Sequence, residues 1–208
     1  MNVLVVSATE FEIQSFKDEN NTADVLITGV GVPATIFHLT KKLFEKKYDL
    51  VIQAGIAGSF TNTLKNGNVV LIEKDTFGDI GISEKGNFKT LFETGFVNEN
   101  DFPFTNGWLI NPHEYCGNSS VPFAIGVTVN KVIDDVSQIK SLAEKFSPGV
   151  ESMEGAALHY VCLQQNINFL QLRSISNMVG ERDKQKWEMK EAITNLNIQL
   201  KKLVQHFI

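Results

Sequence analysis

The chain has 208 residues, of which 43% are hydrophobic and 21% are charged, and its formal net charge is −5. These values are typical of a soluble globular protein, and the length predicts a single domain over residues 1–208. An acidic chain lacks the basic surface used in nonspecific nucleic-acid binding, so we expect no nucleic-acid partner. The N-terminus lacks the regions of a signal peptide and no apolar run reaches membrane-spanning length, which predicts a cytoplasmic protein without a membrane partner.

Apolar runs in the first part of the chain predict three strands, at residues 2–6, 24–28 and 48–54, and the continuous run at 2–6 is typical of a strand buried on both faces. We expect helices between them. The first begins near Glu10, and the second begins at Pro33, which suits a first helical turn, and continues to residue 47. The buried side of the second helix is expected to consist of Ile36, Phe37, Leu39, Leu43 and Phe44.

The glycines of residues 29–34, GVGVPA, suggest a dinucleotide-binding loop, since GxGxxA is a tolerated form of that motif. The motif also needs an acidic residue at the end of the following strand. That residue is absent, because Asp49 precedes the strand. The segment is therefore predicted to be a tight turn between a strand and a helix.

The second part of the chain continues the alternation of strands and helices, which predicts an α/β fold with a mainly parallel or mixed central sheet. We expect a loop at 55–59, strands at 69–73, 121–128 and 168–175, helices at 133–146 and 150–163, and a terminal helix from Asp183 or Lys184 to Phe207. Ser147 or Ser152 can cap the helix at 150–163. Residues 76–122 show no clean periodicity and are interpreted as a lid or an interface.

Glutamate side chains lie beside two of the predicted strand and helix ends. Glu10 and Glu12 come after the carboxyl end of the first strand, where α/β proteins place their sites. Because these two side chains cannot face the same way on a helix, at most one should point inward. Glu154 is expected in the first turn of its helix, where unpaired backbone N–H groups and the helix dipole favour a carboxylate.

Five segments, in this order, resemble the nucleoside phosphorylase/nucleosidase superfamily and specifically its hydrolytic branch. They are SATEFE, VLITGVGVPA, DLVIQAGIAGSF with LKNGNVVLIEK, ESMEGAALHYVC and LRSISN. The resemblance implies a nucleoside phosphorylase-like fold, a three-layer α/β sandwich with a mixed central sheet, assembled as a homo-oligomer (a dimer or larger). It also implies a small-molecule nucleoside substrate and no cofactor. Cys116 and Cys162 lie at no metal-ligand spacing, so we expect no metal site.

The resemblance also implies roles for individual residues. Glu12 is expected to be the general base on a water molecule, with Glu10 as the alternative. Glu154 is expected to accept hydrogen bonds from the ribose hydroxyls, and Met153 to pack against the sugar. Other residues are expected to line the substrate: Ile56, Ala57 and Gly58 in the glycine segment and Val132 beside the base. Two further hypotheses concern the 5′ substituent of the nucleoside, where Arg182 or Lys184 would meet a carboxylate and Phe102, Phe104 and Trp108 would cover an apolar group.

Departures from the family pattern bear on the substrate. Adenine-specific nucleosidases have aspartate where this chain has Asn177, whose amide can donate to O6 of a 6-oxopurine such as hypoxanthine. The phosphorylases gather arginines in their N-terminal half, whereas no arginine precedes Arg173, which favours hydrolysis over phosphorolysis. The tail SNMVGERDKQKW is similar to hydrolases that release hypoxanthine in menaquinone biosynthesis. The alternatives are a methylthioadenosine/S-adenosylhomocysteine nucleosidase, a phosphate-dependent phosphorylase and a non-catalytic nucleoside-binding protein.

Overall fold

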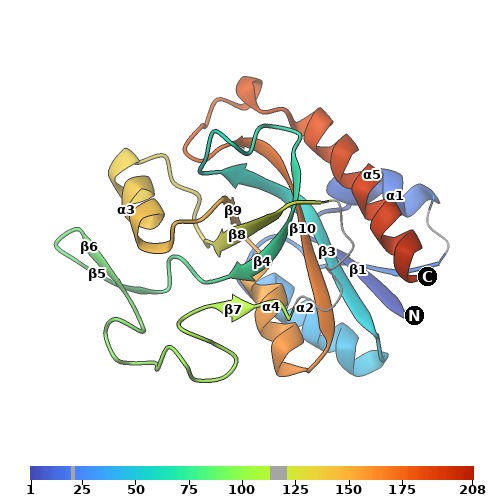
Figure 1. Ribbon diagram of the computed structural model, residues 1–208, viewed down its shortest axis with the longest axis horizontal. Coiled ribbons are helices and arrows are strands. Elements are labelled where there is room, and N and C mark those ends of the chain that lie inside the picture. Colours follow the sequence, from blue (N-terminus) through green and yellow to red (C-terminus); the bar gives the residue numbers. More distant parts are fainter. Residues whose placement is uncertain (20–21, 113–120) are drawn as a thin grey trace.

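The structure is a computed structural model that describes residues 1–19, 22–112 and 121–208 (Figure 1). Its main sheet contains eight strands: β1 (Val3–Ser7), β2 (Asp24–Ile27), β3 (Leu50–Ser59), β4 (Val69–Asp75), β7 (Leu109–Ile110), β8 (Phe123–Thr128), β9 (Val150–Ser152) and β10 (Asn168–Met178). A separate hairpin consists of β5 (Gly81–Glu84) and β6 (Asn87–Thr90). The helices are α1 (Glu10–Glu19), α2 (Val32–Glu45), α3 (Val136–Phe146), α4 (Gly155–Gln164) and α5 (Met189–Phe207), with a 3-10 turn, η1 (Lys184–Lys186).

Two hydrophobic cores lie on opposite faces of the sheet. Successive side chains of a strand point to opposite faces, so Val3 and Val5 of β1 pack with α1 and α5, while Leu4 and Val6 pack with α2 and α4. Figure 1 shows α1 and α5 together on one side of the sheet and α2 and α4 together on the other. The sheet is mixed, because β3 pairs in parallel with β1 and β10 and antiparallel with β9. The predicted three-layer α/β sandwich with a mixed central sheet is confirmed.

Strand β3 lies at the centre of the sheet and is longer than predicted. The expected loop at 55–59 is wrong, since β3 continues to Ser59. Its last residue pairs with Met178 of β10 on one side and with Val150 of β9 on the other. These long-range hydrogen bonds hold the glycine segment extended despite its low strand propensity. β10 also pairs with β4, so β3, β10, β4, β8 and β9 form a closed ring of strands.

The helix expected at 150–163 is divided in the structure. Its first three residues form β9, which lies between β3 and β8, and the helix itself begins after Glu154. Ser147 is not an N-cap but ends α3 in the left-handed conformation, with φ of 44°. Ser152 is the last residue of β9 and accepts a hydrogen bond from the N–H of Gly155 at 3.2 Å. The N-cap of α4 is Glu154, so the predicted N-cap at Ser152 and the predicted place of Glu154 in the first turn are both wrong by one or two residues.

The buried face of α2 differs from the prediction in two positions. Leu39 and Leu43 are buried, with Val32 and Thr35 on the same stripe. Phe37 and Phe44 are 64% and 77% exposed. They lie seven residues apart and share a second stripe, turned away from the sheet by the 100° rotation between successive helical residues.

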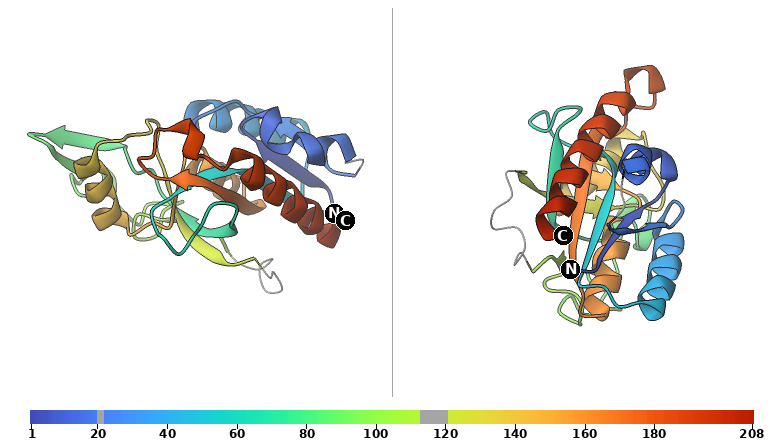
Figure 2. Two further views of the ribbon diagram at one scale, coloured as in Figure 1. Left: turned by 90° about the horizontal axis from the view of Figure 1, so that it is seen from above. Right: turned by 90° about the vertical axis from the view of Figure 1, so that its right-hand side faces the viewer.

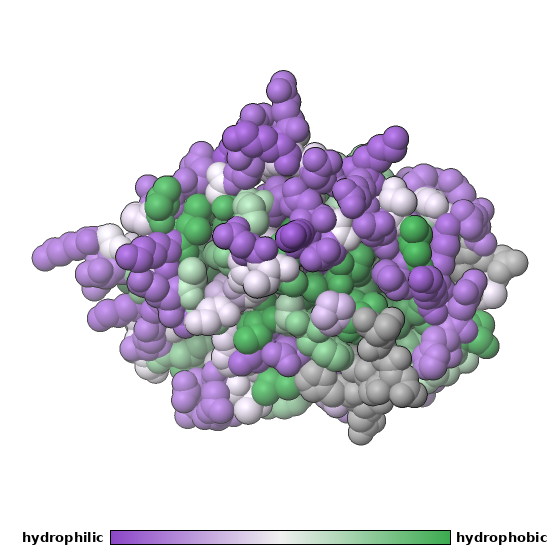
Figure 3. Space-filling model, turned by 45° about the horizontal axis from the view of Figure 1, so that its top comes forward, coloured by the Kyte–Doolittle hydropathy of each residue, from purple (hydrophilic) through white to green (hydrophobic). Residues whose placement is uncertain are grey.

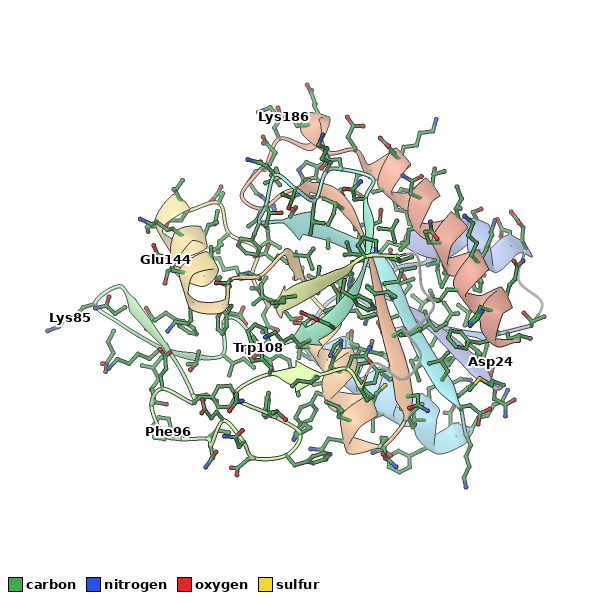
Figure 4. The ribbon with its side chains drawn as sticks, viewed as in Figure 1. Asp24, Lys85, Phe96, Trp108, Glu144 and Lys186 are labelled. Carbon is green, nitrogen blue, oxygen red and sulfur yellow. The ribbon has the colours of Figure 1, made fainter. Side chains whose placement is uncertain are left out.

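The β5–β6 hairpin lies at the end of the molecule away from α5 (Figure 1). The β5–β6 hairpin projects from the body in the left view of Figure 2, and Figure 4 places Lys85 at its tip and Phe96 on the following loop. Phe104 packs against Phe92 and Trp108 against Phe146, with ring centroids 5.1 and 6.1 Å apart. Hydrophilic side chains cover most of the face seen in Figure 3. Within residues 1–19, 22–112 and 121–208, no helix combines the length and apolarity needed to cross a membrane.

Candidate active site

A cavity of about 320 Å³ lies beside the carboxyl ends of β1, β3 and β10. Its size falls at the lower end of the range for small-molecule sites. The walls are mostly apolar and carry a few polar groups. The lining residues are Ala8, Thr9, Phe11, Glu12, Val30, Ile56, Ala57, Gly58, Val132, Glu151, Ser152, Met153, Glu154, Ser176, Asn177, Trp187 and Met189. Eight of the nine residues proposed from sequence therefore meet in one cavity, and Arg182 is the exception.

Glu12 enters the cavity from the first turn of α1. Its Oε2 accepts hydrogen bonds from the N–H and the hydroxyl of Thr9 at 3.0 and 2.7 Å, and its Oε1 accepts from the N–H of Ile56 at 3.0 Å. Each carboxylate oxygen can accept two hydrogen bonds, so Oε1 retains one free position for a water molecule. Glu10 instead lies outside the cavity, half exposed, in an ion pair with Lys17. The expectation that only one of the two glutamates points inward is confirmed.

Glu154 lies on the opposite side of the sheet's glycine segment, directly before α4. Its Oε1 accepts a hydrogen bond from the N–H of Gly31 at 3.0 Å. Gly31 is the N-cap of α2 with φ of 93°, so the predicted strand-to-helix turn is confirmed and its backbone amide is aimed at the carboxylate. Burial raises the pKa of Glu154, an effect opposed by the nearby Arg173 guanidinium and by the Gly31 amide.

Arg173 is buried beside Glu154 and was not proposed as a site residue from sequence. It is only 1% exposed, and it donates hydrogen bonds to Gln53 at 2.7 Å and to Gln171 at 2.9 Å. Its Nη1 lies 3.6 Å from Oε2 of Glu154. A Cβ atom at Gly55 would lie 2.4 Å from that Nη1 and 3.1 Å from Oε1 of Glu12. The missing side chain at Gly55 therefore leaves room for both the Arg173 guanidinium and the Glu12 carboxylate.

A second layer of buried polar groups supports the start of α4. Gln171 donates to Asp75 at 3.0 Å and also lies 3.0 Å from Nε2 of His159. Burial lowers the pKa of His159 to about 3, so the ring is neutral and contacts Leu109 O through Nδ1 at 2.9 Å. Burial also raises the pKa of Asp75 to about 6. Asp75 accepts from the hydroxyl of Thr128, which in turn accepts from the N–H of Ala156 at 2.7 Å.

Asn177 lies at the end of the cavity away from Arg173, near the end of β10. Its Nδ2 donates to Met178 O at 2.8 Å, and its Oδ1 accepts from the Ser176 hydroxyl at 2.7 Å. The amide still has one N–H hydrogen to donate and one lone pair to accept with. A bulge in β10 between Ile175 and Asn177 turns this side chain toward the cavity.

The other nine lining residues were not proposed from sequence, and Glu151, Trp187 and Met189 are among them. Trp187 follows η1 and its indole N–H donates to Glu181 O at 2.9 Å. The exposed Arg182 lies over the Trp187 ring at 5.9 Å instead of lining the cavity. Trp187 and Val132 line the same cavity, and the only sequence signal for Trp187 was its place in the tail SNMVGERDKQKW.

Other sequence hypotheses have different outcomes. The aromatic side chains Phe102, Phe104 and Trp108 do not line the cavity of the described chain. His113 and Cys116 lie outside the described residues, as does the side chain of Lys184. Among the residues that are described, no three histidine, cysteine or acidic side chains come together as metal ligands.

Comparison with known proteins identifies the family. Residues 4–208 match the Phosphorylase superfamily. The futalosine hydrolase of Thermus thermophilus is 28% identical over 183 residues, which are 86% of this chain and 80% of that protein. The futalosine hydrolase of Acidothermus cellulolyticus is 30% identical over 179 residues, 84% of this chain and 72% of that protein.

The solved structures show the same fold. A 5′-methylthioadenosine/S-adenosylhomocysteine nucleosidase from Neisseria meningitidis, in complex with methylthio-immucillin-A, superposes with a TM-score of 0.82 at 18% identity over 99% of both chains. The family expected from the five sequence segments is thus confirmed, and the relatives include proteins named futalosine hydrolase. The chain belongs to the phosphorylase superfamily.

Proposed function

We propose that the protein hydrolyses the N-glycosidic bond of futalosine and releases hypoxanthine, a reaction of menaquinone biosynthesis. The observation that carries this proposal is the meeting of Glu12, Glu154 and Asn177 in one cavity of about 320 Å³. The similarity to proteins named futalosine hydrolase supports it.

Cleavage of a ribosyl C–N bond develops positive charge on the sugar and negative charge on the departing base. Glu154 accepts hydrogen bonds from the ribose hydroxyls and stabilises the positive sugar. Gly31 and Arg173 fix the orientation of its carboxylate before the substrate arrives. Glu12 takes a proton from a water molecule as the water attacks, through the free position on Oε1. Met153 packs its thioether against the sugar, beside Glu154.

Asn177 recognises the base. The unused N–H of its amide donates to O6 of hypoxanthine, and its carbonyl accepts the proton carried on N7 of the leaving base. An amide is not an acid, so the N7 proton comes from water. An adenine base presents an amino group at the O6 position, which would leave buried polar groups unpaired at a cost of about 1–3 kcal/mol.

The attacking group is water and not phosphate. Among the described residues that line the cavity, none is a lysine or an arginine. Arg173 lies nearby but is 1% exposed, and its donors are engaged by Gln53, Gln171 and Ile56. A phosphate ion in this cavity would therefore meet the carboxyl groups of Glu12, Glu151 and Glu154 and no free cation.

We further propose that the enzyme is a single domain that works in the cytoplasm as a homo-oligomer. Phe11 and Val30 line the cavity and are 66% and 56% exposed, and Phe37 on α2 is 64% exposed. Large apolar side chains at the edge of a site support contact with a second copy of the chain.

The test is a comparison of substrates. Futalosine, inosine and methylthioadenosine are each incubated with the protein in buffer with and without phosphate, and the released base is identified by chromatography. We expect hypoxanthine from futalosine, at a rate that phosphate does not change. Release of adenine from methylthioadenosine with futalosine left intact would assign the chain to the adenine-specific nucleosidases, and a ribose-1-phosphate product would make it a phosphorylase.

A further inference from the structure

Glu151 is a buried carboxylate in the cavity for which neither the fold nor the mechanism above provides a role. It lies on β9, is only 6% exposed and lines the cavity. Within the described structure its Oε2 has no hydrogen-bond partner. Buried carboxylate oxygens are rarely left unpaired, so an unpaired one that faces a cavity indicates a ligand that supplies a donor.

The sheet places Glu151 opposite Asn177. Gly58 of β3 pairs with Glu151 of β9 on one side and with Asn177 of β10 on the other. Residues paired across neighbouring strands point to the same face, and two strand spacings separate the two Cα atoms by about 10 Å. Gly58, Glu151 and Asn177 all line the same cavity. A planar base can lie there with one polar edge reaching both side chains.

Two charged side chains act on the Glu151 carboxyl group. Its pKa is raised to about 7, mainly by burial and to a lesser extent by the Asp79 carboxylate, while the Arg182 guanidinium opposes the rise. Asp79 is itself held by the backbone and side-chain amides of Asn130. The strand neighbours of Glu151 in the sheet, Gly58 and Val127, carry no charge. The carboxyl group is therefore poised to ionise near neutral pH.

We propose that Glu151 is a second base-reading residue, whose carboxylate accepts the N1–H of a 6-oxopurine while Asn177 donates to the adjacent O6. This inference rests on the proposed function and extends it to the specificity of the same site. A 6-oxopurine presents an acceptor at O6 beside a donor at N1, and the pair Asn177 and Glu151 matches that order. A 6-aminopurine presents the reverse order, so its N1 lone pair would face the carboxylate. Asn177 contacts only the group at position 6 of the base, and Glu151 contacts the group at position 1.

The main test compares futalosine with its 6-amino analogue in the wild type and in Glu151→Gln. A glutamine amide can turn to accept from N1–H or to donate to N1, so it no longer distinguishes the two bases. We expect the ratio of kcat/KM for futalosine to kcat/KM for the amino analogue to fall at least ~10-fold. The matched control is Glu10→Gln, because Glu10 is exposed and outside the cavity, and it should leave the ratio unchanged. Equal losses on both substrates would make Glu151 a structural residue and overturn the proposal.

The pH profile provides a second readout. Since the ionised form of Glu151 is the acceptor, kcat/KM of the wild type on futalosine should increase as the pH rises through about 7. This step should vanish in Glu151→Gln. It should move to lower pH in Asp79→Asn, because the neighbouring negative charge is removed. A step that persists unchanged in Glu151→Gln belongs to another group and contradicts the proposal.

Binding of the free bases separates this proposal from the proposed function. Isothermal titration calorimetry should show that the wild type binds hypoxanthine more tightly than adenine and that Glu151→Gln loses the preference. If the wild type retains this preference but does not cleave futalosine, the substrate assignment fails and the base-reading role stands. If it cleaves futalosine but Glu151→Gln keeps the wild-type ratio and preference, the role of Glu151 fails and the proposed function stands.

Discussion

Substitution of Gly55 by alanine tests the arrangement of charges beneath the cavity. The added Cβ would lie 2.4 Å from Nη1 of Arg173, a distance that requires one of the two groups to move. The guanidinium has no free space to withdraw into, since Gln53 and Gln171 hold it at 2.7 and 2.9 Å. Overpacking of this kind lowers the free energy of unfolding by about 1–3 kcal/mol. In a chain of this size each kcal/mol lowers Tm by about 2–4 °C, so we expect a decrease of about 2–12 °C.

The same substitution should impair catalysis, because Oε1 of Glu12 lies 3.1 Å from the added atom. Thermal unfolding followed by circular dichroism measures Tm, and the rate of hypoxanthine release measures activity below the transition. The matched control is Gly149→Ala, whose Cβ would meet Ala124 and Leu64 no closer than 3.4 Å. The reasoning is refuted if Gly55→Ala keeps both the Tm and the rate of the wild type, or if Gly149→Ala loses as much of either.

Two further substitutions test the roles assigned to the cavity. Glu154→Gln should lower kcat/KM on futalosine by at least ~10², because the neutral amide no longer stabilises the positive sugar, and steady-state kinetics would contradict this role by showing a wild-type value. Asn177→Asp places a carboxyl oxygen against O6, so kcat/KM should fall by about 5- to 150-fold on futalosine, equivalent to about 1–3 kcal/mol, and rise on the 6-amino analogue. If both values fall together or neither changes, Asn177 is a structural residue of the β10 bulge.

The apolar pattern predicted much of the fold because the spacing of buried apolar residues along the chain determines whether a segment forms a strand or a helix. The run in β1 alternates between two cores, with Val3 and Val5 on one face and Leu4 and Val6 on the other, and this requires an apolar residue at every position. The prediction failed where distant partners decide the structure. The glycine segment at 55–59 is a strand only because β9 and β10 pair with it from both sides.

In the candidate site, too, some residues could be predicted from the sequence and others could not. Glu12 and Glu154 could be selected in sequence because each stands next to an element boundary within a family-like segment. Arg173 and Glu151 could not, because each follows an apolar residue within a strand and its importance depends on residues far along the chain. A polar residue inside an apolar strand was the available signal for Arg173. Glu151 resembled a charged residue before a helix until β9 placed it in the cavity.

The most direct test of the account is the rate of hypoxanthine release from futalosine, in buffer without phosphate, by the wild type, Glu12→Gln and Glu10→Gln. The two glutamates lie two residues apart, but only Glu12 faces the cavity and offers a free carboxylate position to water. We predict that Glu12→Gln lowers kcat by at least ~10² while the variant stays folded at the assay temperature and still binds hypoxanthine, and that Glu10→Gln has the wild-type rate. A wild-type rate in Glu12→Gln, or a comparable loss in Glu10→Gln, would contradict hydrolysis by a water molecule that Glu12 activates.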